Sequence, residues 1–196
     1  MDKDVNVFDA INNFAKLRGY YNQYSKPALN WYRQQISNLG NINKLKLLGD
    51  NIKYQQSRPE IGRFCMYFYS PKYKEELPYY DAFPLILTLP SEKYEIAGLN
   101  FHYLSPMDRL KLLQAIMEIQ GSNFSESHKL IATYELVKGV TELYKPTYHA
   151  YLYKHIKSRV VVIPMESVVP AVFLPIASFK KASQTKVWSA GKKLLV

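Results

Sequence analysis

Apolar residues recur at helical spacing in the first quarter of the chain. Val5, Phe8, Ile11 and Phe14 are each three residues apart, and Gly19 follows as a plausible helix stop. The next periodic segment begins at a Ser-x-Pro start signal and ends before a glycine. The pattern therefore predicts a small helical unit with helices over 5–17, 25–39 and 44–48.

The pattern changes after residue 60, where whole segments are apolar without helical periodicity. Three such segments are separated by short polar or proline-containing links: RFCMYFY (63–69), FPLILTL (83–89) and YEIAGLN (94–100). Runs of this kind are typical of buried strands, and the short links favour antiparallel pairing. We therefore expect a small antiparallel sheet in which the polar link 72–76 is an exposed hairpin tip.

Helical spacing returns after residue 104. Ser105 and Pro106 form a helix start signal, because serine is a good N-cap and proline fits the first turn. The pattern predicts helices over 105–120, 125–139, 146–158 and 178–190, with short strands at 160–163 and 171–174. The predicted fold class is α+β. An N-terminal helical segment or arm (1–55) precedes an α+β core (56–196), in which a small antiparallel sheet packs on a helical C-terminal half.

Positive charge is concentrated toward the C-terminal end. The chain carries 26 Lys/Arg against 16 Asp/Glu, a formal charge of +10, and residues 141–196 contribute +7 of it. A basic section of this density suits nucleic acid or an acidic protein surface, and a solubilising face is the simpler alternative. The candidate contact residues are Lys145, Lys154, Lys157, Arg159, Lys180, Lys181, Lys186, Lys192 and Lys193.

Aromatic residues alternate with these cations in KPTYHAYLYKHIKSR (145–159). On a helix, Tyr148 and Tyr151 share one side with Tyr144. Stacked aromatics beside cations bind single strands or DNA ends without reading the bases. Alternatively, the tyrosines are half-buried core residues with solvated hydroxyls. On the first interpretation, Tyr148 and Tyr151 are assigned as aromatic support for the contact surface.

No pattern in the chain indicates a reaction centre. The four histidines lack metal-site spacing, the glycines form no phosphate loop, and Cys65 sits in an apolar segment as a small hydrophobe. Nothing in the spacing pairs Asp81 with Asp108 as metal ligands. We therefore predict a non-enzymatic protein without metal or cofactor. With one cysteine and no membrane-length apolar run, it is expected to be soluble and cytoplasmic in origin.

Four stretches together resemble one family of virion proteins. They occur in the order 31–48, 62–89, 98–116 and 172–194, and their most specific pieces are LPYYDAFPL (77–85) and GLNFHYL (98–104). On these motifs the chain is similar to small virion proteins of contractile-tailed bacteriophages that are labelled DNA end protectors. The resemblance covers about residues 30–194 and implies no catalytic residues.

The two specific motifs have a structural interpretation of their own. In LPYYDAFPL, two prolines flank an aromatic pair and an acid, which favours an extended crossing anchored by Tyr79, Tyr80 and Phe83. In GLNFHYL, Gly98 allows close backbone approach, and Asn100 or His102 is expected to hydrogen-bond across to a strand end. Both motifs are therefore predicted to stabilise the scaffold.

Resemblance and charge lead to two functional hypotheses. The first is a non-enzymatic virion protein that binds and protects the end of packaged genomic DNA, without sequence preference, through its basic residues. The alternative is a structural component of the phage neck, tail terminus or baseplate that assembles by protein–protein contacts. Both imply a location in the virion and, during assembly, in the host cytoplasm. The expected partners are phage DNA ends or other virion proteins, with no membrane and no small-molecule substrate.

Overall fold

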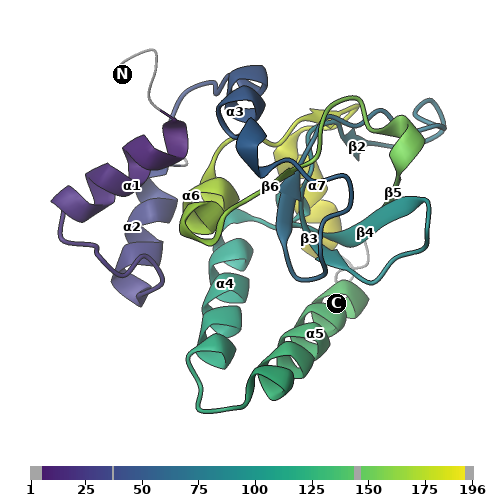
Figure 1. Ribbon diagram of the computed structural model, residues 1–196. Coiled ribbons are helices and arrows are strands. Elements are labelled where there is room, and N and C mark those ends of the chain that lie inside the picture. The colour runs from purple at the N-terminus through teal and green to yellow at the C-terminus, as the bar shows by residue number, and fades with distance from the viewer. Residues whose placement is uncertain (1–5, 37, 144–146, 193–196) are drawn as a thin grey trace.

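The computed structural model describes residues 6–36, 38–143 and 147–192. Its N-terminal part consists of helices α1 (Val7–Leu17), α2 (Lys26–Ile36) and α3 (Lys44–Asp50), as the apolar spacing predicts. The apolar faces of α1 and α2 pack on the central helix α6 (Val168–Phe173), and Phe8 and Leu29 are completely buried. Figure 1 shows α6 lying between this pair and the rest of the molecule.

A five-stranded sheet forms the centre of the fold. Its strands lie in the order β5-β4-β3-β1-β6, and every neighbouring pair is antiparallel, as expected. The strands are β1 (Phe64–Met66), β3 (Leu85–Leu89), β4 (Glu95–Asn100), β5 (Tyr148–Leu152) and β6 (Val161–Val162). Gly98 is required within β4, because a Cβ there would collide with the carbonyl oxygen of Leu87 on β3.

Side chains alternate between two hydrophobic clusters on the two faces of the sheet. Phe64 and Met66 face the larger cluster, which the helices cover. Cys65 and Tyr67 face the smaller one, together with Ile96 and Tyr151. Burial raises the pKa of the Cys65 thiol, so this cysteine behaves as the small hydrophobe predicted from sequence.

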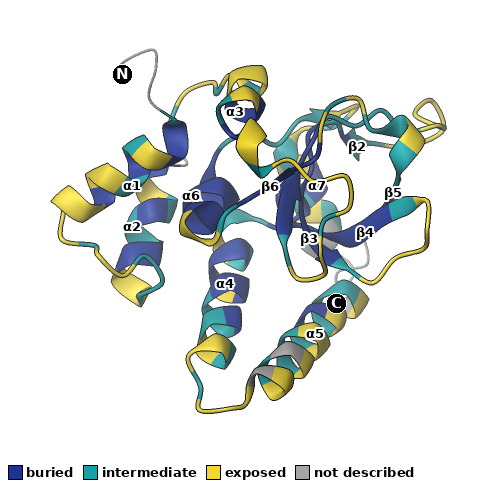
Figure 2. Cartoon of the chain, in the orientation of Figure 1, coloured by how far each residue is buried: buried dark blue, intermediate teal, exposed yellow. Residues whose placement is uncertain are grey.

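The remaining helices surround the sheet. α4 (Pro106–Gln120) begins as predicted: the Ser105 hydroxyl accepts a hydrogen bond from the backbone N–H of Asp108. α5 (Glu126–Leu143) returns antiparallel to α4, and the two project from the body as a hairpin (Figure 1). Figure 2 shows that much of the α5 surface is exposed. No helix in the described residues is long and apolar enough to span a membrane.

Two segments differ from the sequence prediction in type. The predicted helix over 146–158 is wrong in its described part: Tyr148–Leu152 is the edge strand β5, followed by the 3₁₀ turn η4 (Tyr153–His155). The predicted strand 171–174 is also wrong, because Val168–Phe173 is helix α6. All six residues of α6 are buried, so packing overrides the strand propensity of its valines. Pro170 is tolerated in its first turn.

The C-terminal segment begins with a short strand. Phe179–Lys180 forms β7 and pairs antiparallel with β2 (Tyr80–Asp81), so the last helix, α7 (Gln184–Lys192), begins later than predicted. Two further 3₁₀ turns are η2 (Phe101–Tyr103) and η5 (Met165–Ser167). The α+β class is confirmed, whereas the division at residue 55 stays a prediction.

Candidate nucleic-acid interface

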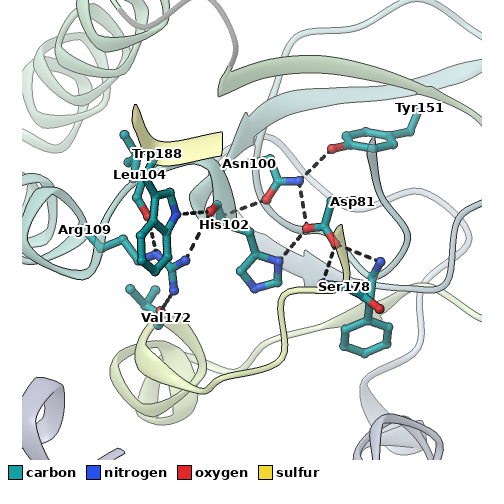
Figure 3. A network of polar contacts seen from close by, with 10 residues as sticks. Asp81, Asn100, His102, Leu104, Arg109, Tyr151, Val172, Ser178 and Trp188 are labelled. Carbon is teal, nitrogen blue, oxygen red and sulfur yellow. Dashed lines mark hydrogen bonds and ion pairs between the residues drawn. The ribbon is translucent and has the colours of Figure 1, made fainter. Parts of the chain in front are cut away.

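A buried polar network surrounds Asp81 at the point where β2, β4 and the C-terminal segment meet (Figure 3). One carboxylate oxygen accepts backbone hydrogen bonds from Phe83 and Ser178, both at 3.0 Å. The other accepts from the side-chain amide of Asn100 at 3.2 Å and lies 2.6 Å from Nδ1 of His102. Asp81 thus connects three segments that are far apart in the sequence.

Asn100 and His102 reach Asp81 because β4 ends in a tight turn. The Asn100 side-chain oxygen caps η2 by accepting from the backbone N–H of His102 at 3.0 Å. Its amide also donates to the Tyr151 hydroxyl at 2.9 Å. The prediction that Asn100 or His102 bonds across to a strand end is therefore confirmed for both, and LPYYDAFPL and GLNFHYL meet at this network.

Burial sets the charges of the Asp81–His102 pair. Burial lowers the pKa of His102 and outweighs the opposing effect of Asp81. Burial alone raises the pKa of Asp81, but His102 and the backbone donors outweigh it, so the pKa lies below its ordinary value. Asp81 is therefore a carboxylate that accepts a hydrogen bond from Nδ1–H of a neutral His102 imidazole. Nε2 of this imidazole has no hydrogen-bond partner among the described residues.

Arg109 extends the network into the helices. Its buried guanidinium donates to the backbone carbonyls of Leu104, Val172 and His102 at 2.9–3.3 Å. Trp188 of α7 donates its indole N–H to the same His102 carbonyl at 2.9 Å. Arg109 remains charged, since burial lowers its pKa only to about 10. The buried network therefore contains one negative and one positive charge.

This network has a structural role. The side chains of Asp81 and His102 are both fully buried, so no substrate reaches the pair. Asp108, the other acid considered as a metal ligand, is instead hydrogen-bonded to the Ser105 hydroxyl at 2.5 Å. In the described part of the chain, no three His, Cys, Asp or Glu side chains are grouped to hold a metal ion.

A hollow of about 260 Å³ opens beside the network. We call it the Tyr-lined hollow, because aromatic rings form most of its wall and floor: Tyr69, Tyr79, Tyr80, Tyr103, His149 and Tyr151. Tyr103 and Tyr151 are buried beneath it, and Tyr73 and Lys72 stand at its exposed rim. Asp81 contributes to the lining from below.

The rings of the Tyr-lined hollow support one another. The Tyr103 centroid is 4.4 Å from that of His149 and 6.1 Å from that of Tyr79. Tyr151 is 4.9 Å from Tyr69, with the rings nearly perpendicular. Such edge-to-face and tilted contacts add stability beyond simple burial. The buried network below and these ring contacts therefore make the hollow a preformed feature.

One lysine lines the Tyr-lined hollow, and lysines from two other segments interact with its lining residues. Lys72 lines it and places Nζ 4.5 Å from the Tyr73 ring centroid. Its hydrogen bond to Tyr73 lowers the pKa of that phenol, and the charge of Lys154 acts in the same direction. Lys180 pairs with the lining residue Tyr80 across β2–β7. Lys181 donates to the carbonyls of Glu75 and Leu77 at 2.7 and 3.4 Å.

Lys181 has a strained backbone. Its φ of 66° lies in the left-handed region, where it is the only non-glycine residue among those described. A lysine in this region costs about 1 kcal/mol relative to ordinary backbone angles. In this backbone conformation, Lys181 Nζ reaches the loop over residues 73–77, to which it is hydrogen-bonded.

A model of the phage T4 terminal DNA protecting protein family matches residues 13–195. The chain belongs to this family. No curated protein and no solved structure matches it.

In this member of the terminal DNA protecting family, the predicted contact residues divide into two groups. Lys154, Lys180 and Lys181 do not line the Tyr-lined hollow but interact with its lining residues: Lys154 acts on Tyr73 through its charge, Lys180 is the strand partner of Tyr80, and Lys181 donates to the Leu77 carbonyl. The other described residues are Lys157, whose backbone N–H donates to Phe68, Arg159, just before β6, and Lys186, on α7, and none of them lines it. Lys145 and Lys193 lie outside the described residues, as does the side chain of Lys192.

The two tyrosines predicted as aromatic support do not share a face. Because β5 is a strand, residues three apart point to opposite sides of the sheet. Tyr148 is 44% exposed, whereas Tyr151 is buried and forms part of the floor of the hollow. Sequence reasoning did not single out Lys72, Tyr73 and Tyr79, which line the hollow, although the alternation of Lys and Tyr in 72–74 is the same signal used for 145–159.

The lysine cluster also contains acidic residues. Glu75 carries ion pairs with Lys181 at 3.7 Å and Lys74 at 4.0 Å. Both pairs involve an exposed carboxylate and are weak in water. Lys72, Lys74, Lys154, Lys180 and Lys181 outnumber Glu75, Glu76 and Glu95 at this surface, so it retains a net positive charge.

Proposed function

We propose that the protein binds the ends of phage genomic DNA, without sequence preference and without catalysis, and thereby shields them from exonucleases. The observation that carries this proposal is the Tyr-lined hollow, which Lys72 lines and whose lining residues Tyr73, Tyr80 and Leu77 interact with Lys154, Lys180 and Lys181. Family membership supports the same role. The proposed location is the virion, and the host cell during assembly.

The charge pattern supports contact with the DNA backbone. Lysines neutralise phosphates and release counterions, which gives affinity without sequence information. Aromatic rings add sequence-tolerant stacking on bases that a DNA end exposes and a continuous duplex does not. Together, cations around an aromatic hollow favour an end over an internal site.

A second role in virion assembly has support from the α4–α5 hairpin. Ile131 and Tyr134 on α5, and Phe124 in the loop before it, are between 39% and 58% exposed. Exposed large apolar side chains of this kind are typical of protein contact surfaces. Contacts with neighbouring virion proteins would therefore use a different surface from the lysines.

Binding to open and closed DNA tests the proposed function. The affinity for a short linear duplex is compared with that for a dumbbell of the same sequence whose ends are closed by loops. We expect the linear duplex to bind about tenfold tighter, a difference of about 1.4 kcal/mol. Log K should fall with log[salt] by about 0.9 per phosphate contact. Equal affinity for both DNAs, or no binding of the linear duplex at low salt, would contradict the proposal.

A further inference from the structure

We infer that the Tyr-lined hollow binds one unpaired terminal nucleotide of the DNA end. This inference rests on the proposed function and deepens it, because it states which part of the DNA the protein recognises. It predicts a preference for ends with an overhanging or frayed base over fully paired ends.

The size of the hollow limits its occupant to a small group. Its volume of about 260 Å³ is below the roughly 300–1,000 Å³ of sites for drug-sized ligands. A single nucleobase suits such a space, whereas a base pair is too wide. A base must therefore leave its partner before it enters.

The wall chemistry favours a flat aromatic ligand. Tyr79 and His149 flank the buried ring of Tyr103 at centroid distances of 6.1 and 4.4 Å. Aromatic side chains bind unpaired bases by stacking, and every base offers a face for it. This tolerance matches a protein that acts on DNA ends without sequence preference.

The charges around the hollow select an anion. Aromatic pockets also bind organic cations, but Lys72 lines this one and Lys181 is hydrogen-bonded to its lining residue Leu77. The carboxylate of Asp81 is fully buried below the hollow and already accepts four hydrogen bonds within the network. A cation is therefore disfavoured, whereas a nucleotide combines a stacking base with a phosphate that the lysines attract.

Geometry places the phosphate partner next to the base site. Lys72 Nζ lies 4.5 Å from the Tyr73 ring centroid at the rim, and Tyr73 is 53% exposed. The phosphate of the nucleotide whose base enters the hollow would meet Lys72 there. Lys72 and Tyr73 would thus contact the phosphate and the base, respectively, of one nucleotide.

The test uses three duplexes, each with one end closed by a hairpin loop. The open end is blunt, carries a one-nucleotide overhang with 2-aminopurine, or carries an abasic overhang. We expect the base-bearing overhang to bind about tenfold tighter than the abasic one, and the 2-aminopurine fluorescence to be quenched on binding. Equal affinities without quenching would overturn the inference, even if all three duplexes bind. Failure of all three to bind at low salt would instead refute the proposed function.

Two variants locate the effect. Tyr79→Leu removes a wall of the hollow, and Tyr73→Leu removes an exposed rim residue whose loss does not threaten folding. Both should reduce the preference for the base over the abasic overhang, and Tyr79→Leu should reduce it to less than threefold. The matched control is Tyr94→Leu, since Tyr94 is also exposed and lies beside a lysine, Lys93, but does not line the hollow. An unchanged preference in both variants, or an equal loss in the control, would contradict the inference.

Discussion

Asp81→Ala is expected to lower the free energy of unfolding by about 3–5 kcal/mol. The substitution leaves four N–H groups without their acceptor: the backbone N–H groups of Phe83 and Ser178, one of the two side-chain N–H groups of Asn100, and Nδ1–H of His102. It also removes the negative charge that balances buried Arg109. Urea denaturation measures the change.

Two comparisons isolate the cause of that loss. Glu76→Ala removes an exposed carboxylate and should change the stability by less than about 0.5 kcal/mol. Asp81→Asn keeps an oxygen that accepts from two of the donors. Its loss in the free energy of unfolding should therefore lie between those of Glu76→Ala and Asp81→Ala. If Asp81→Ala were as mild as Glu76→Ala, the network would not hold these segments together.

The same variants report on pH. The pKa of Asp81 is lowered in the folded state, so its ionic contribution is present above its unfolded pKa of about 3.9 and is lost as the pH falls through the folded value. The stability difference between the native protein and Asp81→Ala should therefore shrink in acid.

Reversing the charge of four lysines is expected to reduce affinity for a linear duplex by about a hundredfold or more at low salt. Lys72 lines the Tyr-lined hollow, and Lys154, Lys180 and Lys181 interact with its lining residues. Replacing each with Glu turns phosphate attraction into repulsion. The salt dependence should also become shallower, by about 0.9 in slope for each lost phosphate contact. Titration of a labelled duplex at several salt concentrations measures both quantities.

A matched variant separates position from net charge. Lys16, Lys26, Lys111 and Lys138 lie on α1, α2, α4 and α5, and reversing all four changes the net charge by the same amount. At about 0.1 M salt we expect this variant to lose less than about tenfold in affinity, because long-range attraction is then screened within about 10 Å. Equal losses in the two variants would show that the DNA contacts are not at the hollow.

The sequence predicts those elements whose local signals and packing agree. α1 and α4 have clear apolar spacing and recognisable ends, such as Ser105 with Pro106. β3 and β4 are mostly apolar segments, and all but one residue of each is buried. In these segments the local preference and the tertiary environment favour the same conformation.

Other elements depend on neighbours that the sequence does not reveal. Residues 148–152 become a strand because the edge of β4 is available to them, with Ala150 opposite Ala97 and Tyr151 opposite Ile96. Val168–Phe173 becomes a helix because it packs against α1, α2 and α4 in the interior. No local pattern distinguishes these outcomes from the alternatives.

The candidate site is predictable only in part for the same reason. Lys154, Lys180 and Lys181 follow from charge density, and the contacts of Asn100 and His102 follow from the specific motifs. The role of Lys72 and Tyr79 depends on β2 pairing with β7, which brings residues 80 and 180 together. Because residues 80 and 180 are far apart in the sequence, local sequence patterns do not predict the hollow.

Protection of the terminal nucleotides is the most direct test of end binding. A linear duplex labelled at one end is saturated with the protein and digested with an exonuclease, beside the same duplex carrying an internal nick. We predict that the terminal nucleotides survive while digestion proceeds from the nick. Removal of the terminal nucleotides at the rate seen for free DNA, with the protein bound, would contradict the proposal that this protein covers the DNA end.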